Sequence, residues 1–245
     1  MPVLYRLAEM VIEPRRILGL ATLPSFLTGF ATLRRRGEPA TIADMWPMLG
    51  DRRPRTPFDP HYFFQAAWLA RQLAMRRPAA HTDVGSDVRL IAAISGMVPV
   101  TFLDFRPLLV TLPNLNCVAG DICALPWDDR SVPSLSCLHV IEHVGLGRYG
   151  DPIDPQGSRR ALAELVRVLA PGGTFYLTTP VGQPRTQYNA HRIFDALAVL
   201  QLAAPLELES FAMVDDHGQF HSDCTPDRAL GLKYGCGMFV LRRPG

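Results

Sequence analysis

The sequence is poor in lysine, in charge of either sign and in long apolar runs. Lys233 is the only lysine among 245 residues, and 25 basic residues stand against 23 acidic ones. Because proteins that bind nucleic acid neutralise phosphates with a basic excess, a net charge of +2 does not favour a nucleic-acid partner. One apolar segment, Ile17–Leu33, has seventeen residues and contains Pro24. It is therefore marginal as a membrane span.

Cysteine is scarce and unpatterned. The five cysteines are odd in number and include no C-x-x-C pair, and Cys117 and Cys137 lie inside apolar runs. This usage predicts reduced thiols in the core of a cytoplasmic protein. Met1-Pro2 is not followed by a basic stretch and a cleavable apolar core, so we expect no signal peptide.

Length and charge distribution suggest one sizeable domain with an appendage. Residues 1–57 carry nine basic residues against five acidic ones, whereas the rest of the chain has no such excess. We predict an N-terminal helical extension or cap at 1–57 and a main domain at 58–245. Peripheral membrane contact through the arginine-flanked residues 15–36 is the less favoured alternative. The sequence leaves the oligomeric state open.

From residue 58 the pattern predicts alternating helices and strands. Asp59-Pro60 opens a helix over 61–75, followed by short strands at 80–86, 98–102, 115–119, 135–141 and 174–179. Helices are expected at 88–95, 158–169 and 190–202, and closing strands at 206–214 and 238–242. Strands that alternate with helices in this way predict a mostly parallel sheet covered by helices on both faces.

Polar residues follow the predicted strands at one edge of this sheet. Asp83, with Gly85 and Ser86, ends the first strand, and Asp104 lies 21 residues further on, after the second. That spacing places a carboxylate on the ribose diol in Rossmann-type sheets. Asp121 follows the third strand, where its carboxylate and a backbone amide can bind adenine. We therefore expect these side chains and His139 to converge on one nucleoside-sized hollow.

Two motifs after the fourth strand suggest other chemistry. His139-Val-Ile-Glu142-His143 fits the H-x-x-E-H zinc pattern, but that pattern requires a helix, and the preceding residues favour a strand. Residues 145–150 fit G-x-G-x-x-G, but Asp-Pro-Ile-Asp-Pro follows instead of a helix. We therefore expect no metal and no nicotinamide cofactor, and keep a zinc hydrolase as a lesser alternative.

Taken together, residues 79–243 resemble the class I S-adenosylmethionine-dependent methyltransferase superfamily. The matching motifs are the loop 83–86, the aspartates after the second and third strands, the fourth strand, and Glu164–Gly173, which is highly characteristic. The resemblance implies a Rossmann-like fold with a seven-stranded, mostly parallel sheet and an antiparallel last strand. Segments 57–62, 104–107, 145–152 and 189–192 further resemble a largely uncharacterised bacterial branch known as a domain of unknown function.

The resemblance implies S-adenosyl-L-methionine as cofactor and assigns residues to it. The cofactor-binding set would comprise Asp83, Gly85, Ser86, Asp104, Arg106, Gly120, Asp121, Ile122 and His139. Ser86 and Asp87 depart from the family, which has further glycines there, and the Asp87 carboxylate would crowd the methionine carboxylate.

Methyl transfer to a hydroxyl needs a base, for which an imidazole is suited. We predict His143 in that role, oriented by Glu142 or Asp151. Substrate contacts are expected from Arg148, Tyr149, His191 and Arg192, with a small molecule or glycan as acceptor. The alternative function is a catalytically degenerate cofactor-binding module that docks on a membrane or protein partner through the N-terminal segment.

Overall fold

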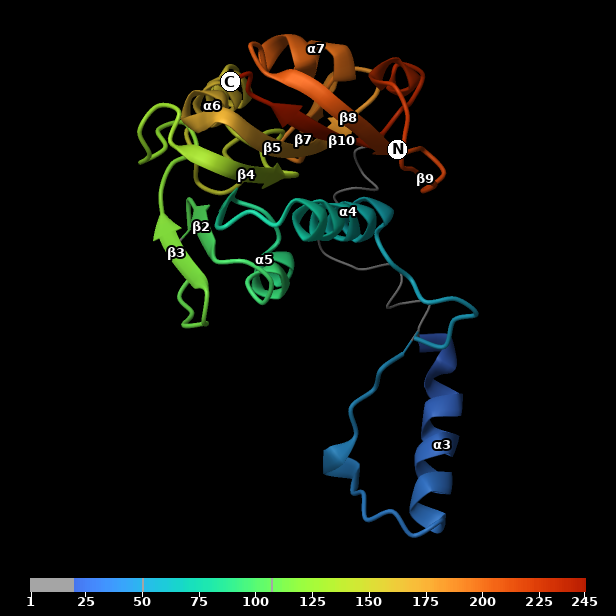
Figure 1. The fold of residues 1–245 in the computed structure, drawn as a ribbon. Helices are drawn as coiled ribbons and strands as arrows, with labels where there is room; N and C mark the ends of the chain where they lie inside the picture. The colour runs from blue at the N-terminus through green and yellow to red at the C-terminus, as the bar shows by residue number, and fades with distance from the viewer. Residues whose placement is uncertain (1–19, 50, 107) are drawn as a thin grey trace. The chain divides into compact units, whose positions relative to one another are not determined.

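The computed structural model describes residues 20–49, 51–106 and 108–245. The chain divides into two compact units, Met1–Phe58 and Asp59–Gly245 (Figure 1). The start of the arginine-flanked segment 15–36 and Pro107 of the motif 104–107 lie outside the described residues.

Among the described residues of the first unit, the α-helix α3 (Leu23–Arg35) lies between two short 3₁₀ helices, η1 (Leu20–Thr22) and η2 (Ile42–Asp44). Pro24 lies in the first turn of α3, where a missing N–H costs nothing, so it starts the helix instead of breaking it. No residue of α3 is buried. None of the helices in the described residues combines the length and apolar character needed to span a bilayer.

The second unit is built on one large sheet in the strand order β3-β2-β1-β4-β5-β10-β8-β9. Parallel pairing joins β1 (His81–Val84), β2 (Val100–Asp104), β3 (Leu115–Ala119), β4 (Val132–Leu138) and β5 (Leu169–Val181). β10 (Gly235–Arg242) is inserted antiparallel between β5 and β8 (Glu207–Val214). The predicted strands and the antiparallel last strand are confirmed, and the two-residue β9 (Phe220–His221) extends the edge.

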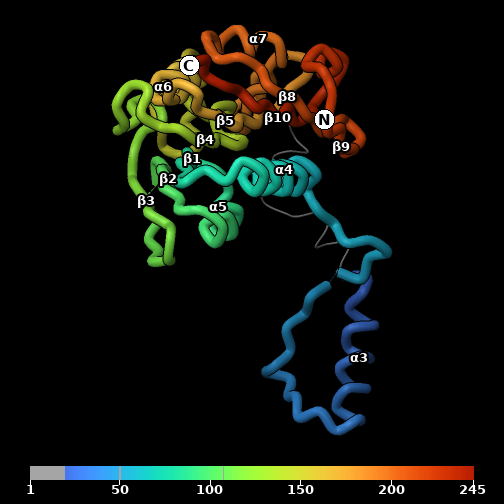
Figure 2. Tube along the Cα trace, viewed as in Figure 1, coloured from blue at the N-terminus to red at the C-terminus, as the bar shows by residue number. Residues whose placement is uncertain are grey.

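Helices cover both faces of this sheet (Figures 1 and 2). α4 (Pro60–Arg76) and α5 (Val88–Ile94) pack on one face, and α6 (Gly157–Val168) and α7 (Ala196–Leu202) on the other. β10 contributes to both cores because its side chains alternate: Met238 packs with α4, and Phe239 packs with the α6 side. Cys236, two residues before Met238, therefore also faces the α4 side.

Among the predicted boundaries that were wrong, two lie near the site. The helix expected at 190–202 begins only at Ala196, because β7 (His191–Ile193) pairs with β6 (Arg185–Gln187) in a hairpin and Asp195 caps the helix. The fourth strand ends at Leu138 instead of residue 141, since His139 has a left-handed backbone with φ 55°. A non-glycine residue in this conformation is strained, and such strain is typical of functional sites.

Candidate functional site

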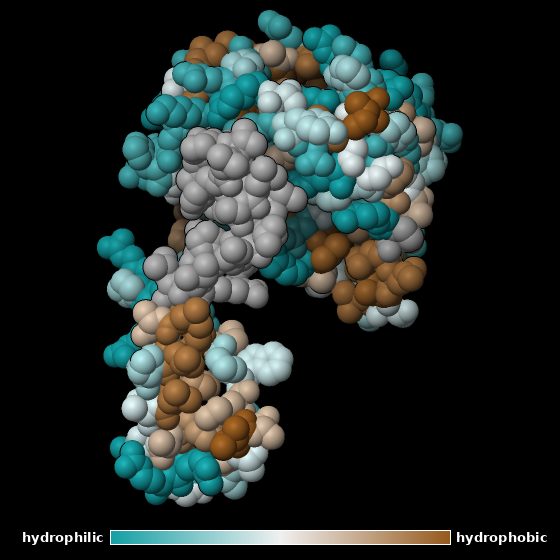
Figure 3. Space-filling model, turned by 180° about the vertical axis from the view of Figure 1, so that it is seen from behind, coloured by the Kyte–Doolittle hydropathy of each residue, from teal (hydrophilic) through white to brown (hydrophobic). Residues whose placement is uncertain are grey.

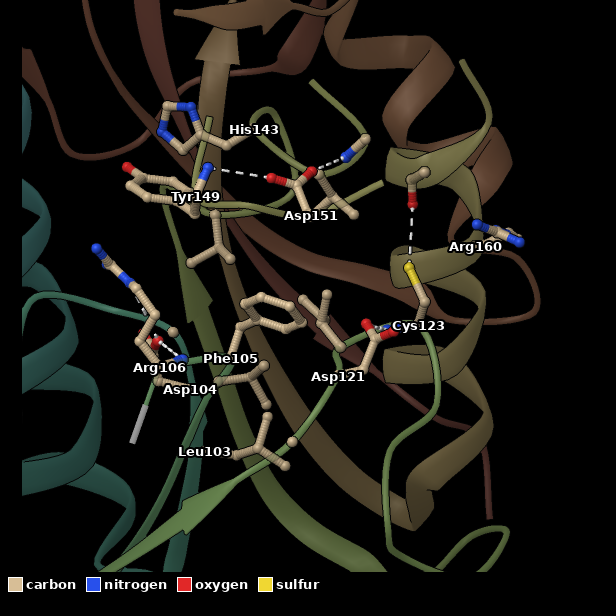
Figure 4. A pocket seen from close by; sticks show the side chains of 18 of the residues that line it. Leu103, Asp104, Phe105, Arg106, Asp121, Cys123, His143, Tyr149, Asp151 and Arg160 are labelled. Atoms are coloured by element: carbon tan, nitrogen blue, oxygen red, sulfur yellow. Dashed lines mark hydrogen bonds and ion pairs between the residues drawn. The ribbon is translucent and has the colours of Figure 1, made fainter. Parts of the chain in front are cut away.

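A cavity opens at the carboxyl ends of β1 to β4, the edge where open α/β sheets bind ligands (Figure 4). It encloses about 940 Å³ of empty space, part of which is open to solvent. Its walls come from the loops after these four strands and from the start of α6.

Asp104 and Asp121 both line the cavity, as predicted from their strand-end positions. One oxygen of Asp104 accepts from the backbone N–H of Arg106 at 2.7 Å, and one of Asp121 accepts from Cys123 N–H at 2.8 Å. These bonds from a backbone N–H two residues further on hold each carboxylate in place. The second oxygen of each carboxylate accepts no hydrogen bond within the described residues. Two oriented carboxylates on neighbouring strand ends can therefore accept bonds from a ligand.

The wall beside Asp121 offers a donor as well. The backbone N–H of Ile122, whose side chain lines the cavity, has no hydrogen-bond partner within the described residues. Gly120 and Gly85, two of the predicted cofactor-binding residues, also line the cavity. Gly85 has a φ of +73°, and a Cβ on it would lie 3.0 Å from Val140 Cγ1. Glycine is therefore required there by both backbone and space.

Asp83 and Ser86 do not line the cavity, which corrects their expected direct contact with the cofactor. The Asp83 side chain is fully buried and accepts hydrogen bonds from Ser86 N–H, Ser86 Oγ and Ser136 Oγ. Ser86 Oγ in turn accepts from Leu138 N–H. Burial raises the pKa of Asp83 to about 6. These two residues brace the loop behind the cavity wall.

Asp87, where the resembled superfamily has a glycine, does not crowd the cavity. Asp87 caps α5 by accepting from Arg89 N–H at 2.8 Å, and its carboxylate also pairs with the Arg89 guanidinium at 2.6 Å. Asp87 is absent from the described cavity wall. Its charge is therefore compensated at the start of the helix.

His139 lines the cavity and lies in a buried polar chain. Its Nδ1 is 2.7 Å from Glu142 Oε1, and its Nε2 is 3.3 Å from Cys236 Sγ. Burial alone would lower the pKa of His139, but Cys236 and Glu142 raise it to about 10. Burial correspondingly opposes ionisation of Glu142, yet His139 lowers the pKa of this carboxyl.

His143 also lines the cavity, but a different group orients it from those we predicted. Its Nδ1 lies 2.6 Å from the carbonyl oxygen of Ala190, whereas Glu142 Oε1 is 3.8 Å from its Nε2 and already binds His139. We assign the proton to Nδ1, since a carbonyl can only accept. Burial lowers the pKa of His143, so the ring is neutral at neutral pH and its Nε2 can accept a proton.

Asp151 lines the cavity but does not bind His143. Its carboxylate accepts from the backbone N–H groups of Gly145 at 2.7 Å, Tyr149 at 3.1 Å and Gly147 at 3.3 Å (Figure 4). Burial opposes ionisation, but these donors lower the pKa of Asp151. Asp151 therefore holds together the loop that carries Tyr149 and does not orient His143 as predicted.

The rim of the cavity is formed by stacked cationic and aromatic groups. The guanidinium of Arg106 lies over the Tyr149 ring at 4.5 Å and joins the loops after β2 and β4. Both residues line the cavity. Arg148, the residue before Tyr149, does not line the cavity. Its Nη1 donates to Ala190 O at 3.0 Å, beside His143.

The remaining predicted substrate residues lie behind the wall. Arg192 donates to Val144 O at 2.6 Å and to Ser158 Oγ at 2.9 Å, so its role is to brace the loop against α6. His191 stacks on Tyr234 at 5.1 Å, and its buried Nε2 has no partner within the described residues. Neither residue lines the cavity.

The two alternative motifs do not form the sites that they suggest. His139 and His143 lie in a turn, and His143 is not part of the one cluster of candidate metal ligands found in the described residues. Gly145, Gly147 and Gly150 all have positive φ and shape a loop, with no helix following directly. The H-x-x-E-H and G-x-G-x-x-G matches therefore reflect turn geometry.

Sequence reasoning missed several wall residues. Phe105, Cys123 and Arg160 line the cavity (Figure 4). Arg160 pairs with Asp154 at 2.6 Å. Phe105 directly follows Asp104, so its position after a strand was a usable signal. Nothing in the local sequence around Arg160 indicates that the start of α6 borders the same space.

Comparison with known proteins gives a partial match to one family model and a fold shared with solved structures. A family model described as "Caenorhabditis protein of unknown function, DUF268" matches residues 131–219, a little over a third of the chain. No curated protein matches the sequence. The predicted bacterial branch stays a prediction, because the matching description names Caenorhabditis.

Among solved structures, two methyltransferases share the fold. N-methyltransferase NodS from Bradyrhizobium japonicum, in complex with S-adenosylhomocysteine, has a TM-score of 0.53 and 14% identity, covering 80% of this chain and 90% of NodS. The 1,6-didemethyltoxoflavin-N1-methyltransferase of Burkholderia thailandensis, with bound S-adenosylhomocysteine, has a TM-score of 0.50 and 17% identity. The match covers 95% of this chain and 90% of that enzyme. The chain therefore has the Rossmann-like class I methyltransferase fold.

Proposed function

We propose that this protein is an S-adenosylmethionine-dependent methyltransferase that methylates a hydroxyl group of a small molecule or glycan. The observation that carries the proposal is that Asp104 and Asp121, which follow adjacent parallel strands, line one cavity with an available oxygen each. A carboxylate in the place of Asp104 accepts both hydroxyls of a ribose, and charge-assisted bonds of this kind are strong.

The other walls suit the remaining parts of the cofactor. The Asp121 carboxylate and the unpartnered N–H of Ile122 provide an acceptor and a donor side by side, matching the amino group and ring nitrogen of adenine. The close backbone approach at Gly85 leaves room for the methionine end. When bound, the cofactor would supply an electrophilic methyl group on its sulfonium.

His143 is the proposed general base. Its Nδ1–H is anchored on Ala190 O, so Nε2 is left to take the proton of an acceptor hydroxyl as the oxygen attacks. Arg106 and Tyr149 at the rim are exposed enough to meet an acceptor, and their stacking positions a planar cation beside it. In-line attack then depends mainly on how these groups hold donor and acceptor.

Calorimetric titration with S-adenosylmethionine tests the cofactor assignment. Asp104→Ala should weaken binding about 10- to 100-fold, the equivalent of one or two hydrogen bonds to a charged group. Asp87→Ala is the matched control, since its carboxylate pairs with Arg89 outside the cavity wall. No heat with the wild type, or equal binding by both variants, would contradict the proposal.

A second candidate is a catalytically degenerate cofactor-binding module that docks on a membrane or protein partner. It is supported by α3, in which Leu23, Leu27 and Leu33 are exposed and whose last turn carries Arg34 and Arg35. Figure 3 shows apolar surface gathered on this unit. Sedimentation with anionic vesicles tests it: binding abolished by Leu23→Ser with Leu27→Ser would favour this candidate.

A further inference from the structure

Three side chains with metal-binding atoms meet beside the cavity, from three separate elements. His61 lies in the first turn of α4, His139 directly after β4, and Cys236 at the start of β10. Their ligand atoms all lie within 4.8 Å of one another, and all three residues are buried. No other group of this kind is found among the residues that the structure describes.

The spacing fits one edge of a tetrahedral site. Zinc binds sulfur at about 2.3 Å and imidazole nitrogen at about 2.0–2.1 Å, which places the two ligand atoms about 3.5 Å apart in a tetrahedron. Nε2 of His139 lies 3.3 Å from Sγ of Cys236. The His61 ring lies 5.6 Å from the His139 ring between centroids. Since the ligand atoms of all three residues lie within 4.8 Å of one another, the ligand atom of His61 has to move inward by at most about 1.5 Å to bind an ion at this edge.

A carboxylate behind one ligand is the independent observation. Glu142 is fully buried, and its Oε1 lies 2.7 Å from Nδ1 of His139. This contact fixes the orientation of the ring and leaves Nε2 to face Cys236 and the centre of the cluster. Metal-binding histidines almost always have a partner of this kind on the other ring nitrogen, which makes the ligand more basic.

We propose that His61, His139 and Cys236 bind a divalent zinc-class ion, with Glu142 as the outer partner of His139. Two imidazoles and a thiolate suit a borderline-soft ion, whereas calcium and magnesium require oxygen ligands. Binding requires the thiolate and neutral imidazoles, so protons leave as the ion enters. Three protein ligands leave a fourth position open, as in catalytic zinc sites. Since His139 also lines the cavity, this ion would lie at its edge.

The test uses the full chain, stripped of metal by a chelator and titrated with Zn²⁺ by calorimetry and with Co²⁺ by absorbance. We expect one ion per chain and a thiolate-to-cobalt charge-transfer band in the near ultraviolet. Cys236→Ala should abolish the band, whereas Cys137→Ala, which removes an equally buried thiol outside the cluster, should keep it. Glu142→Gln should weaken Zn²⁺ binding about 10- to 100-fold.

The wild-type titration decides the matter even if a variant fails to fold. Absence of Zn²⁺ binding by the wild type, or an undiminished cobalt band in folded Cys236→Ala, would overturn the proposal. The experiment contains no S-adenosylmethionine, so its failure would leave the proposed methyltransferase function untouched.

Discussion

Nδ1 of His143 lies 2.6 Å from the carbonyl oxygen of Ala190, a residue 47 positions further along the chain. The contact joins the loop after β4 to the hairpin of β6 and β7, and it leaves Nε2 as the ring nitrogen without a proton. A backbone carbonyl thus holds the ring as a carboxylate does in many catalytic dyads, and this contact, together with the nearby Glu142, partly offsets the lowering of the pKa of His143 by burial.

The first prediction concerns the protonation of His143. Because burial lowers its pKa below 6.5, the neutral ring, and any activity that needs it as a base, should persist above that pKa and be lost as pH falls through it. Arg148 also lowers the pKa, so Arg148→Met should raise it. NMR titration of labelled histidines measures both effects. Arg159→Met in α6 is the control, and a wild-type midpoint above 6.5 would refute the assignment.

The second prediction concerns Asp83. Its pKa rises from 3.8 to about 6 on folding, so the stability contributed by the protonated carboxyl is present below pH 4 and is lost as pH rises through 6. Relative to Asp83→Asn, the wild type should lose up to about 3 kcal/mol of unfolding free energy between pH 4 and pH 7. Urea unfolding across this range measures the difference.

Asp216 serves as a control for that experiment, because its contribution to stability should change with pH in the opposite direction. Burial opposes its ionisation, but backbone donors at Lys233 and Tyr234 lower its pKa. Its contribution is therefore present above the unfolded pKa and lost as pH falls. A gap between wild type and Asp83→Asn that does not change with pH would contradict the account of Asp83.

The third prediction concerns Gly85. Gly85 has a positive φ, and a Cβ added to it would lie only 3.0 Å from Val140 Cγ1. Gly85→Ala should therefore destabilise the protein by about 1–2 kcal/mol and narrow the cavity. Thermal unfolding measures the first effect and cofactor titration the second. Gly231→Ala, where a Cβ meets nothing within 4 Å, is the control. Equal stability of the two variants would show that the loop tolerates a side chain.

The fourth prediction separates the two roles considered for Asp151. Because its carboxylate binds the amides of Gly145, Gly147 and Tyr149, Asp151→Ala should speed amide hydrogen exchange across this loop. The His143 titration should stay where it is in the wild type. A shifted His143 midpoint with unchanged loop exchange would restore Asp151 as the partner of the imidazole.

The sequence predicted the order of elements well because local patterns carry that information. β3 has the predicted bounds, and α4 begins at the Asp59 cap, whose side chain accepts from His61 N–H and Tyr62 N–H. The helix expected at 190–202 failed in its first turns because pairing of β7 with β6 overrode local propensity.

The site was predictable only in part. Strand ends placed Asp104, Asp121 and His139 at one cavity, but a strand end does not reveal which way a side chain turns. Asp83 turns inward because Ser136, on the neighbouring strand 53 residues away, donates to it. The approach of Cys236 to His139 across 97 residues depends on β10 being inserted next to β5, which no local pattern encodes.

A crystal structure of the protein grown with S-adenosylhomocysteine tests the central claim most directly. The account predicts ribose hydroxyls within hydrogen-bonding distance of the Asp104 carboxylate and adenine against Asp121 and Ile122. A nucleoside bound elsewhere, or bound in this cavity without contact to Asp104, would contradict it.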